Sequence, residues 1–228
     1  MRPPLEILFP KEIGVELIYS FVIIVCSLMI YYSTKEVYEL SSYKGIKYFR
    51  QSFLFFAVAY FFRYFIQFFL VLFNMQSIID ISPGIAFSGS LFVFMYFSSM
   101  AVFYLLYSVM WKKWNHSRTK IILFNIIALA IALIGTLFRS MIVSLALNIL
   151  FLLVVSFILF VAHNDSRKKH GKKNDLLVIY LLLFIFWVLS VIDILIPKFL
   201  ELYRLLIYLV SISLFMAILY RVLKRVGN

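Results

Sequence analysis

Residues 121–162 read IILFNIIALAIALIGTLFRSMIVSLALNILFLLVVSFILFVA, and this stretch decides how the rest of the chain is organised. Its 42 residues contain one charged side chain, Arg139. A helix needs about 20 apolar residues to cross a bilayer whose hydrocarbon core is about 30 Å thick. A continuous helix over this stretch would be about 63 Å long at 1.5 Å per residue. We therefore expect two crossings, with a tight turn at Gly135–Ser140.

The composition of the whole chain also indicates lipid as the surrounding solvent. Of the 228 residues, 64% are hydrophobic and 14% are charged, whereas a soluble domain averages about 45–50% apolar and about 25% charged residues. So few charged side chains cannot cover a globular surface, which excludes a soluble enzyme, a disordered tail and a fibrous repeat. The chain is expected to be an integral membrane protein. Its single cysteine, Cys26, excludes an intramolecular disulfide.

Seven apolar runs predict an all-α membrane protein, a seven-transmembrane helix bundle that forms a single domain over residues 1–228 without a soluble domain. The first run is longer than the core of a signal peptide and no Ala-x-Ala site follows it, so we expect it to be retained as a span. The predicted spans are about 15–32, 52–73, 85–109, 121–138, 141–162, 176–196 and 203–223.

Basic residues predict the orientation of these spans, because Lys and Arg gather in cytoplasmic loops. The segments after spans 1, 3, 5 and 7 hold 16 basic residues, and the alternate segments hold five. We therefore expect a multi-pass protein of the cell membrane with its N-terminus outside and its C-terminus in the cytoplasm. The net charge of +12 is then an orientation signal and not a nucleic-acid footprint.

The most basic loop follows the fifth span. We expect it to contact anionic lipid head groups, and a separate cytoplasmic partner is the alternative. Its basic side chains are Arg167, Lys168, Lys169, Lys172 and Lys173.

Arg63 is the one basic residue that orientation does not explain, because it lies near the middle of the span 52–73. An arginine stays protonated, and an ionisable group inside a membrane is a functional hypothesis by default. Tyr60, Arg63 and Gln67 share one helical face, which should point into the bundle. Two interpretations stay open. Arg63 either forms a hydrogen-bonded hub that fixes helix register, or it binds an anion, a ligand carboxylate or a lipid phosphate.

Further polar residues in the spans suggest a ligand site in the outer half of the bundle. Asp193 is the obvious countercharge for Arg63, but Arg63 lies roughly 10 Å nearer the midplane at 1.5 Å per residue, so their pairing stays open. The predicted ligand-binding residues are Glu16, Tyr60, Arg63, Gln67, Asn148 and Asp193.

Several kinds of catalytic chemistry have no candidate residues in the sequence. The three histidines lie in or beside the predicted cytoplasmic loops, so a histidine zinc site inside the membrane is excluded. A G-x-S-x-G nucleophile motif is absent. Asp193 has no second carboxylate at its depth, which excludes a paired-aspartate protease. We expect no enzyme activity, no cofactor and no metal site.

Residues Tyr31–Arg50, YYSTKEVYELSSYKGIKYFR, followed by Phe53–Phe65, resemble the first hairpin of small uncharacterised archaeal-type seven-transmembrane proteins. The resemblance covers about a quarter of the chain and implies no activity. The seven-span layout is also similar to the membrane sensor regions of microbial signalling proteins. We therefore expect a receptor-like or sensor-like module that binds a small ligand or lipid and signals to a separate cytoplasmic partner.

Two alternatives remain. A small-solute or lipid transporter is the first, although transporters often contain broken helices and none of the predicted spans has an interior proline. An accessory or scaffold subunit, whose polar residues serve packing alone, is the second.

Overall fold

The computed structural model describes residues 11–66, 83–114, 118–138, 140–167, 175–196 and 200–226. Within these ranges the backbone forms seven α-helices and one π-helix, with no strand, which confirms the prediction of an all-α protein. The elements are α2 (Lys11–Ser41), α3 (Lys44–Tyr60), η1 (Phe61–Ile66), α5 (Pro83–Met110), α6 (Arg118–Leu137), α7 (Met141–Arg167), α8 (Asp175–Leu195) and α9 (Glu201–Val226).

Six helices, α2 and α5 to α9, are long and apolar enough to cross a membrane. The chain is therefore a multi-pass membrane protein. Helix α3 is not among the six, since it has 17 residues and carries Lys44, Lys47 and Arg50 in its first half. The predicted span 52–73 combines the second half of α3 with η1 and with residues 67–73, which lie outside the described residues. A count of seven spans and a single domain over the whole chain stay predictions.

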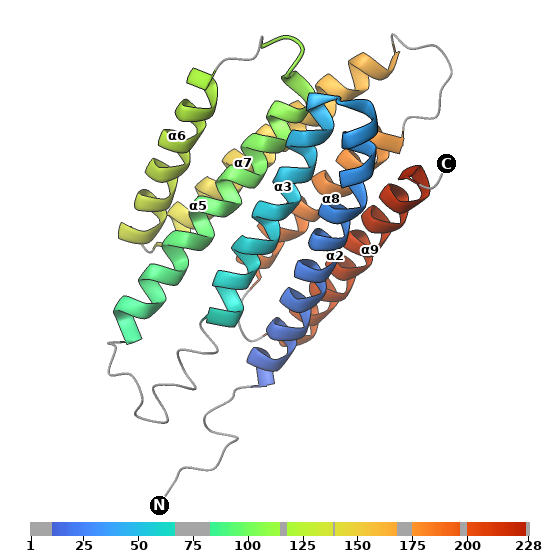
Figure 1. Ribbon diagram of the computed structural model, residues 1–228. Helices are drawn as coiled ribbons and strands as arrows, with labels where there is room; N and C mark the ends of the chain where they lie inside the picture. Colours follow the sequence, from blue (N-terminus) through green and yellow to red (C-terminus); the bar gives the residue numbers. More distant parts are fainter. Residues whose placement is uncertain are drawn as a thin grey trace, which may run out of the picture.

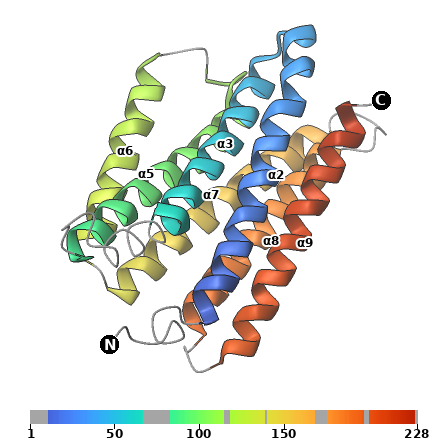
Figure 2. The ribbon, with the colours of Figure 1, turned by 60° about the horizontal axis from the view of Figure 1, so that its bottom comes forward.

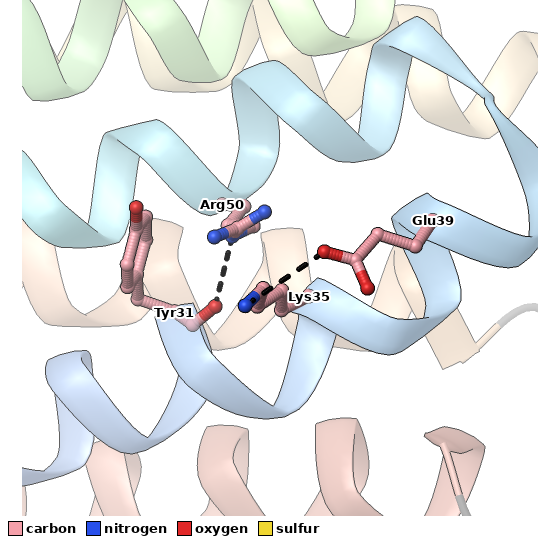
Figure 3. A network of polar contacts seen from close by, with 4 residues as sticks. All are labelled: Tyr31, Lys35, Glu39 and Arg50. Carbon is pink, nitrogen blue, oxygen red and sulfur yellow. Dashed lines mark hydrogen bonds and ion pairs between the residues drawn. The ribbon is translucent and has the colours of Figure 1, made fainter.

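The helices extend beyond the predicted spans because the spans counted apolar residues alone. Helix α2 continues past residue 32 through a polar turn in which Lys35 and Glu39 form an ion pair of 3.8 Å (Figure 3). In the same view, Arg50 of α3 donates from Nε to the carbonyl oxygen of Tyr31 at 3.0 Å. Its guanidinium also lies 4.3 Å from the centre of the Tyr31 ring. The ends of α2 and α3 thus occupy most of the loop expected between the first two spans, and these side-chain contacts join them.

The connection between α2 and α3 consists of Ser42 and Tyr43. Ser42 adopts a left-handed conformation with a φ of 50°, and its N–H donates to the Tyr38 carbonyl at 2.8 Å. Gly45 follows at a close approach to α5, where a Cβ atom would lie 3.0 Å from the carbonyl oxygen of Ser108. The corner therefore depends on a glycine at this position.

The predicted hairpin at Gly135–Ser140 is confirmed, because α6 ends at Leu137 and α7 begins at Met141. The Ser140 hydroxyl accepts a hydrogen bond from the Ile142 N–H at 3.3 Å, and the Ser140 carbonyl accepts from the Ser144 N–H at 3.0 Å. Ser140 therefore satisfies donors that the first turn of a helix leaves free.

The helices run alternately up and down, and six of them form a closed ring (Figure 1). Around the ring, α2 contacts α3, α3 contacts α5, α5 contacts α7, α7 contacts α8, α8 contacts α9, and α9 returns to α2. In the described part, α6 contacts α5 and α7 and lies at the edge of the bundle (Figures 1 and 2). We call the end where α2 begins the lower end, as in Figure 1, and the opposite end the upper end.

Large aromatic side chains fill the middle of the ring. Phe53 and Phe56 of α3, Phe186 of α8 and Phe215 of α9 are fully buried. Phe186 and Phe215 pack edge to face at 4.9 Å between ring centres. Because lipid tails are as apolar as these side chains, close packing rather than escape from water holds membrane helices together.

Candidate functional site

The ring encloses a cavity of about 280 Å³ in its lower half. Every helix of the ring contributes to the cavity wall, as does η1, whereas α6 does not. Five of the six predicted ligand-binding residues line it together, and the sixth, Gln67, lies outside the described residues. The five are Glu16, Tyr60, Arg63, Asn148 and Asp193. That they bind a ligand stays a prediction.

Arg63 reaches the cavity from η1, a π-helical turn that continues α3 without a proline or glycine. π-helical turns are rare and occur often at functional sites. The hydroxyl of Ser90 on α5 donates to the Phe62 carbonyl in this turn. A side chain from the neighbouring helix thus satisfies a backbone group of the irregular turn, which membrane-embedded backbone requires. The sequence analysis missed the π-helix because the segment FFRYFI contains no helix breaker.

The guanidinium of Arg63 contacts aromatic rings and not carboxylates. Its Cζ atom lies 4.7 Å from the centre of the Phe94 ring and 5.0 Å from that of Tyr64. Among the described residues, no carboxylate oxygen lies within 4.0 Å of it, and it donates no hydrogen bond. The hydrogen-bonded hub that the sequence analysis kept open is therefore not formed in the described part of the chain.

Asp193 forms an ion pair with Arg204 instead of Arg63. The distance from Asp193 Oδ1 to Arg204 Nε is 3.6 Å, and both side chains are about one-fifth exposed. Oδ1 is buried and accepts no hydrogen bond from a described residue. Arg204 lies in the first turn of α9 and Asp193 in the last turn of α8, so they share a depth at the lower end. The sequence analysis did not use this shared depth.

Tyrosine side chains join α2, α3 and α9 beside Arg63. The hydroxyls of Tyr19 and Tyr60 lie 3.4 Å apart, and the Tyr19 ring stacks on that of Tyr208 at 4.7 Å between centres. Tyr208 donates from its hydroxyl to Glu16 Oε1 at 3.4 Å. The predicted site therefore lacked two members, Tyr19 and Tyr208. The signal that could have found Tyr19 is its three-residue spacing from Glu16 on one helical face.

Two further polar groups complete the wall of the cavity. Asn148 donates from Nδ2 to the Ser144 carbonyl one turn earlier, at 2.9 Å. Trp187 packs against Phe151 at 5.3 Å between ring centres and is 4% exposed. Its buried Nε1–H has no acceptor among the described residues. A buried donor without an acceptor is uncommon in proteins.

The predicted basic surface is described in part. Arg167 is the exposed last residue of α7, whereas Lys168, Lys169, Lys172 and Lys173 lie outside the described residues. Their contact with anionic lipid or a partner stays a prediction.

Cations stack on aromatic rings elsewhere at the upper end. Lys112 lies over the Tyr43 ring at 5.4 Å, and Lys120 lies over the Trp114 ring at 5.3 Å. Such rings are typical of membrane interfaces.

Across the described ranges, no group of three His, Cys, Asp or Glu side chains is placed to hold a metal ion.

Comparison with known proteins identifies one archaeal relative. An uncharacterised protein of Archaeoglobus fulgidus is 34% identical over 231 residues, which cover 98% of this chain and 95% of the relative. The chain belongs to the family of this archaeal protein. The archaeal resemblance predicted from the first hairpin is thus confirmed and extends over nearly the whole chain, while the comparison leaves the number of spans untested. No family model and no solved structure matches the chain.

Proposed function

We propose that this protein is a receptor-like or sensor-like membrane protein, which binds a small ligand or lipid in the cavity and signals to a separate cytoplasmic partner. The observation that carries the proposal is the cavity itself, with the guanidinium of Arg63 on its wall and no ion-pair partner for it among the described residues. In a scaffold subunit the polar groups of the spans would satisfy one another. A charge that the protein leaves uncompensated is costly, and ligand binding gives a reason to keep it.

The proposal includes seven spans, with the N-terminus outside and the C-terminus in the cytoplasm of a cell-membrane protein. The basic side chains support it, because Lys35, Arg50, Lys112 and Arg167 belong to the upper end of the bundle. Positively charged ends face the cytoplasm. The cavity would then lie in the outer half, and the basic upper end would meet anionic lipid or the partner.

The ring suggests how binding reaches the other end of the molecule. The cavity touches all six helices of the ring, so a ligand that draws their lower ends together changes how the helices pack along their length. A ligand shifts such an equilibrium only by its difference in affinity for the two arrangements. We propose no enzymatic activity. The two carboxylates of the cavity, Glu16 and Asp193, contact different partners, Tyr208 and Arg204, and the sequence has no G-x-S-x-G nucleophile motif.

Native mass spectrometry tests the binding role. The full chain, purified in mild detergent from the membranes of its natural source, is expected to carry a bound small molecule. The variant Arg63→Gln should lose that mass. The control Arg50→Gln removes the same charge at the upper end, from α3, which precedes η1. Arg50 bonds to Tyr31 there, and this variant should retain the bound molecule. Equal retention by both variants would contradict the proposal.

A transporter is the second candidate, and η1 favours it. Transporter sites often lie where a helix is interrupted inside the membrane, and the π-helical turn interrupts α3 beside the cavity without a proline. Uptake of a bound molecule by sealed vesicles containing the purified chain, and its loss in Arg63→Gln, would favour transport. Binding without uptake would favour the receptor.

A further inference from the structure

We propose that the ligand of the cavity is a small organic monocarboxylate, whose carboxylate binds Arg63 while its apolar body packs against the aromatic wall. This proposal rests on the ligand-binding role above and names the chemical class of the ligand.

In the described part of the chain, no anion is in contact with Arg63. Both acidic side chains of the wall already have a donor or a countercharge: Tyr208 donates to Glu16 at 3.4 Å, and Arg204 lies 3.6 Å from Asp193. In the described part, Arg63 has ring contacts alone. It cannot lose its proton to escape the cost of burial, so an anionic group on the ligand would stabilise it.

The donors on the wall suit a carboxylate. Ring contacts attract the positive charge but leave the five N–H groups of the guanidinium without oxygen acceptors. A carboxylate offers two oxygens with about four acceptor positions and matches the guanidinium fork with two parallel bonds.

The remaining wall excludes a more highly charged ligand and favours an apolar body. Glu16 and Asp193 would repel a second negative charge, and Arg204, the other nearby cation, already compensates Asp193. A phosphate dianion therefore fits poorly. Aromatic and aliphatic side chains make up much of the wall, and the volume of about 280 Å³ lies just below the range of about 300–1,000 Å³ for drug-sized ligands. The apolar lining residues include Phe56, Phe94, Phe151, Phe186 and Ile207.

Thermal unfolding of the full chain in lipid nanodiscs, followed as a function of probe concentration, tests the class. Phenylacetate should raise the unfolding midpoint of the wild type and of Arg50→Gln. The neutral analogue phenylacetamide and inorganic phosphate should bind more weakly. Loss of a charge-assisted pair should weaken phenylacetate binding to Arg63→Gln by about 10- to 100-fold. Arg63→Lys keeps the charge without the fork and should bind at an intermediate affinity, and it carries the test if the glutamine variant does not fold.

A second pair of probes distinguishes the source of the carboxylate. Laurate dissolves in the membrane and phenylacetate in water, so tighter binding of laurate indicates a fatty acid and tighter binding of phenylacetate a soluble acid. Both outcomes support the class.

The class is overturned if phenylacetamide or phosphate binds as tightly as the carboxylates, or if Arg63→Gln keeps full affinity. It is also overturned if neither carboxylate binds while native mass spectrometry still finds a bound molecule that depends on Arg63, in which case the ligand-binding role survives. If neither carboxylate binds and no bound molecule is found, both proposals fail.

Discussion

Replacing Arg63 by glutamine tests whether hydrogen bonds and ion pairs within the protein stabilise the guanidinium of Arg63. Glutamine keeps part of the side-chain length and a polar end but removes the charge. If the described contacts are complete, the ligand-free variant loses two ring contacts, at 4.7 and 5.0 Å, and no ion pair. If Arg63 is a structural hub, the variant loses several charge-assisted hydrogen bonds.

The two cases differ by several kcal/mol. Each cation–π contact contributes about 0.5–2 kcal/mol, and the uncompensated ion costs several kcal/mol when fully buried. Arg63 is mostly buried, so it bears much of this cost, which offsets or exceeds the gain from the ring contacts. The free energy of unfolding of the ligand-free variant should therefore change by less than about 1 kcal/mol or rise. A hub with three charge-assisted bonds of about 1.5–3 kcal/mol each would lose about 5 kcal/mol or more.

Equilibrium unfolding in mixed detergent micelles, followed by circular dichroism, measures this change. Asp193→Asn provides the comparison, because it removes the partner of Arg204 and should cost about 1 kcal/mol for a partly exposed pair. A loss of about 4 kcal/mol or more in ligand-free Arg63→Gln would refute the reasoning.

Two other substitutions test the packing of the bundle. Gly45→Ala should destabilise the chain by about 1–3 kcal/mol, because the new Cβ would lie 2.8 Å from Trp111 Nε1. The control Gly89→Ala meets nothing within 4 Å and should be neutral or stabilising by up to about 1 kcal/mol. Equal unfolding midpoints of the two variants would contradict this. Tyr96→Phe removes the 2.6 Å bond to Asn125 that links α5 to α6; it should cost about 0.6 kcal/mol and speed hydrogen exchange in α6, and unchanged exchange would contradict the role of that bond.

Much of the fold follows from the sequence because lipid imposes one strong rule, that each crossing needs a long apolar run. This rule located the hairpin at Gly135–Ser140 from length alone. It misplaced the end of α2, because polar residues such as Lys35 continue a helix beyond the lipid. It could not indicate that α6 lies outside the ring, since helices buried in protein and in lipid are equally apolar.

The residues of the site could be predicted because polar side chains within spans must face into the bundle. That argument gathers Glu16, Tyr60, Arg63, Asn148 and Asp193 from four separate spans into one cavity. It could not pair them, because pairing depends on the relative depth and rotation of different helices. The ion pair of Asp193 with Arg204 and the π-helical turn both depend on that geometry.

The central claim is that Arg63 has no ion-pair partner among the described residues and that small molecules reach it in the cavity. Phenylglyoxal, which modifies accessible arginines, tests it directly when modified positions are read by peptide mass spectrometry of the folded chain. Arg63 should be modified, and phenylacetate should slow that modification while leaving Arg50 unaffected. Arg63 that stays unmodified in the folded chain yet reacts after unfolding would contradict the claim.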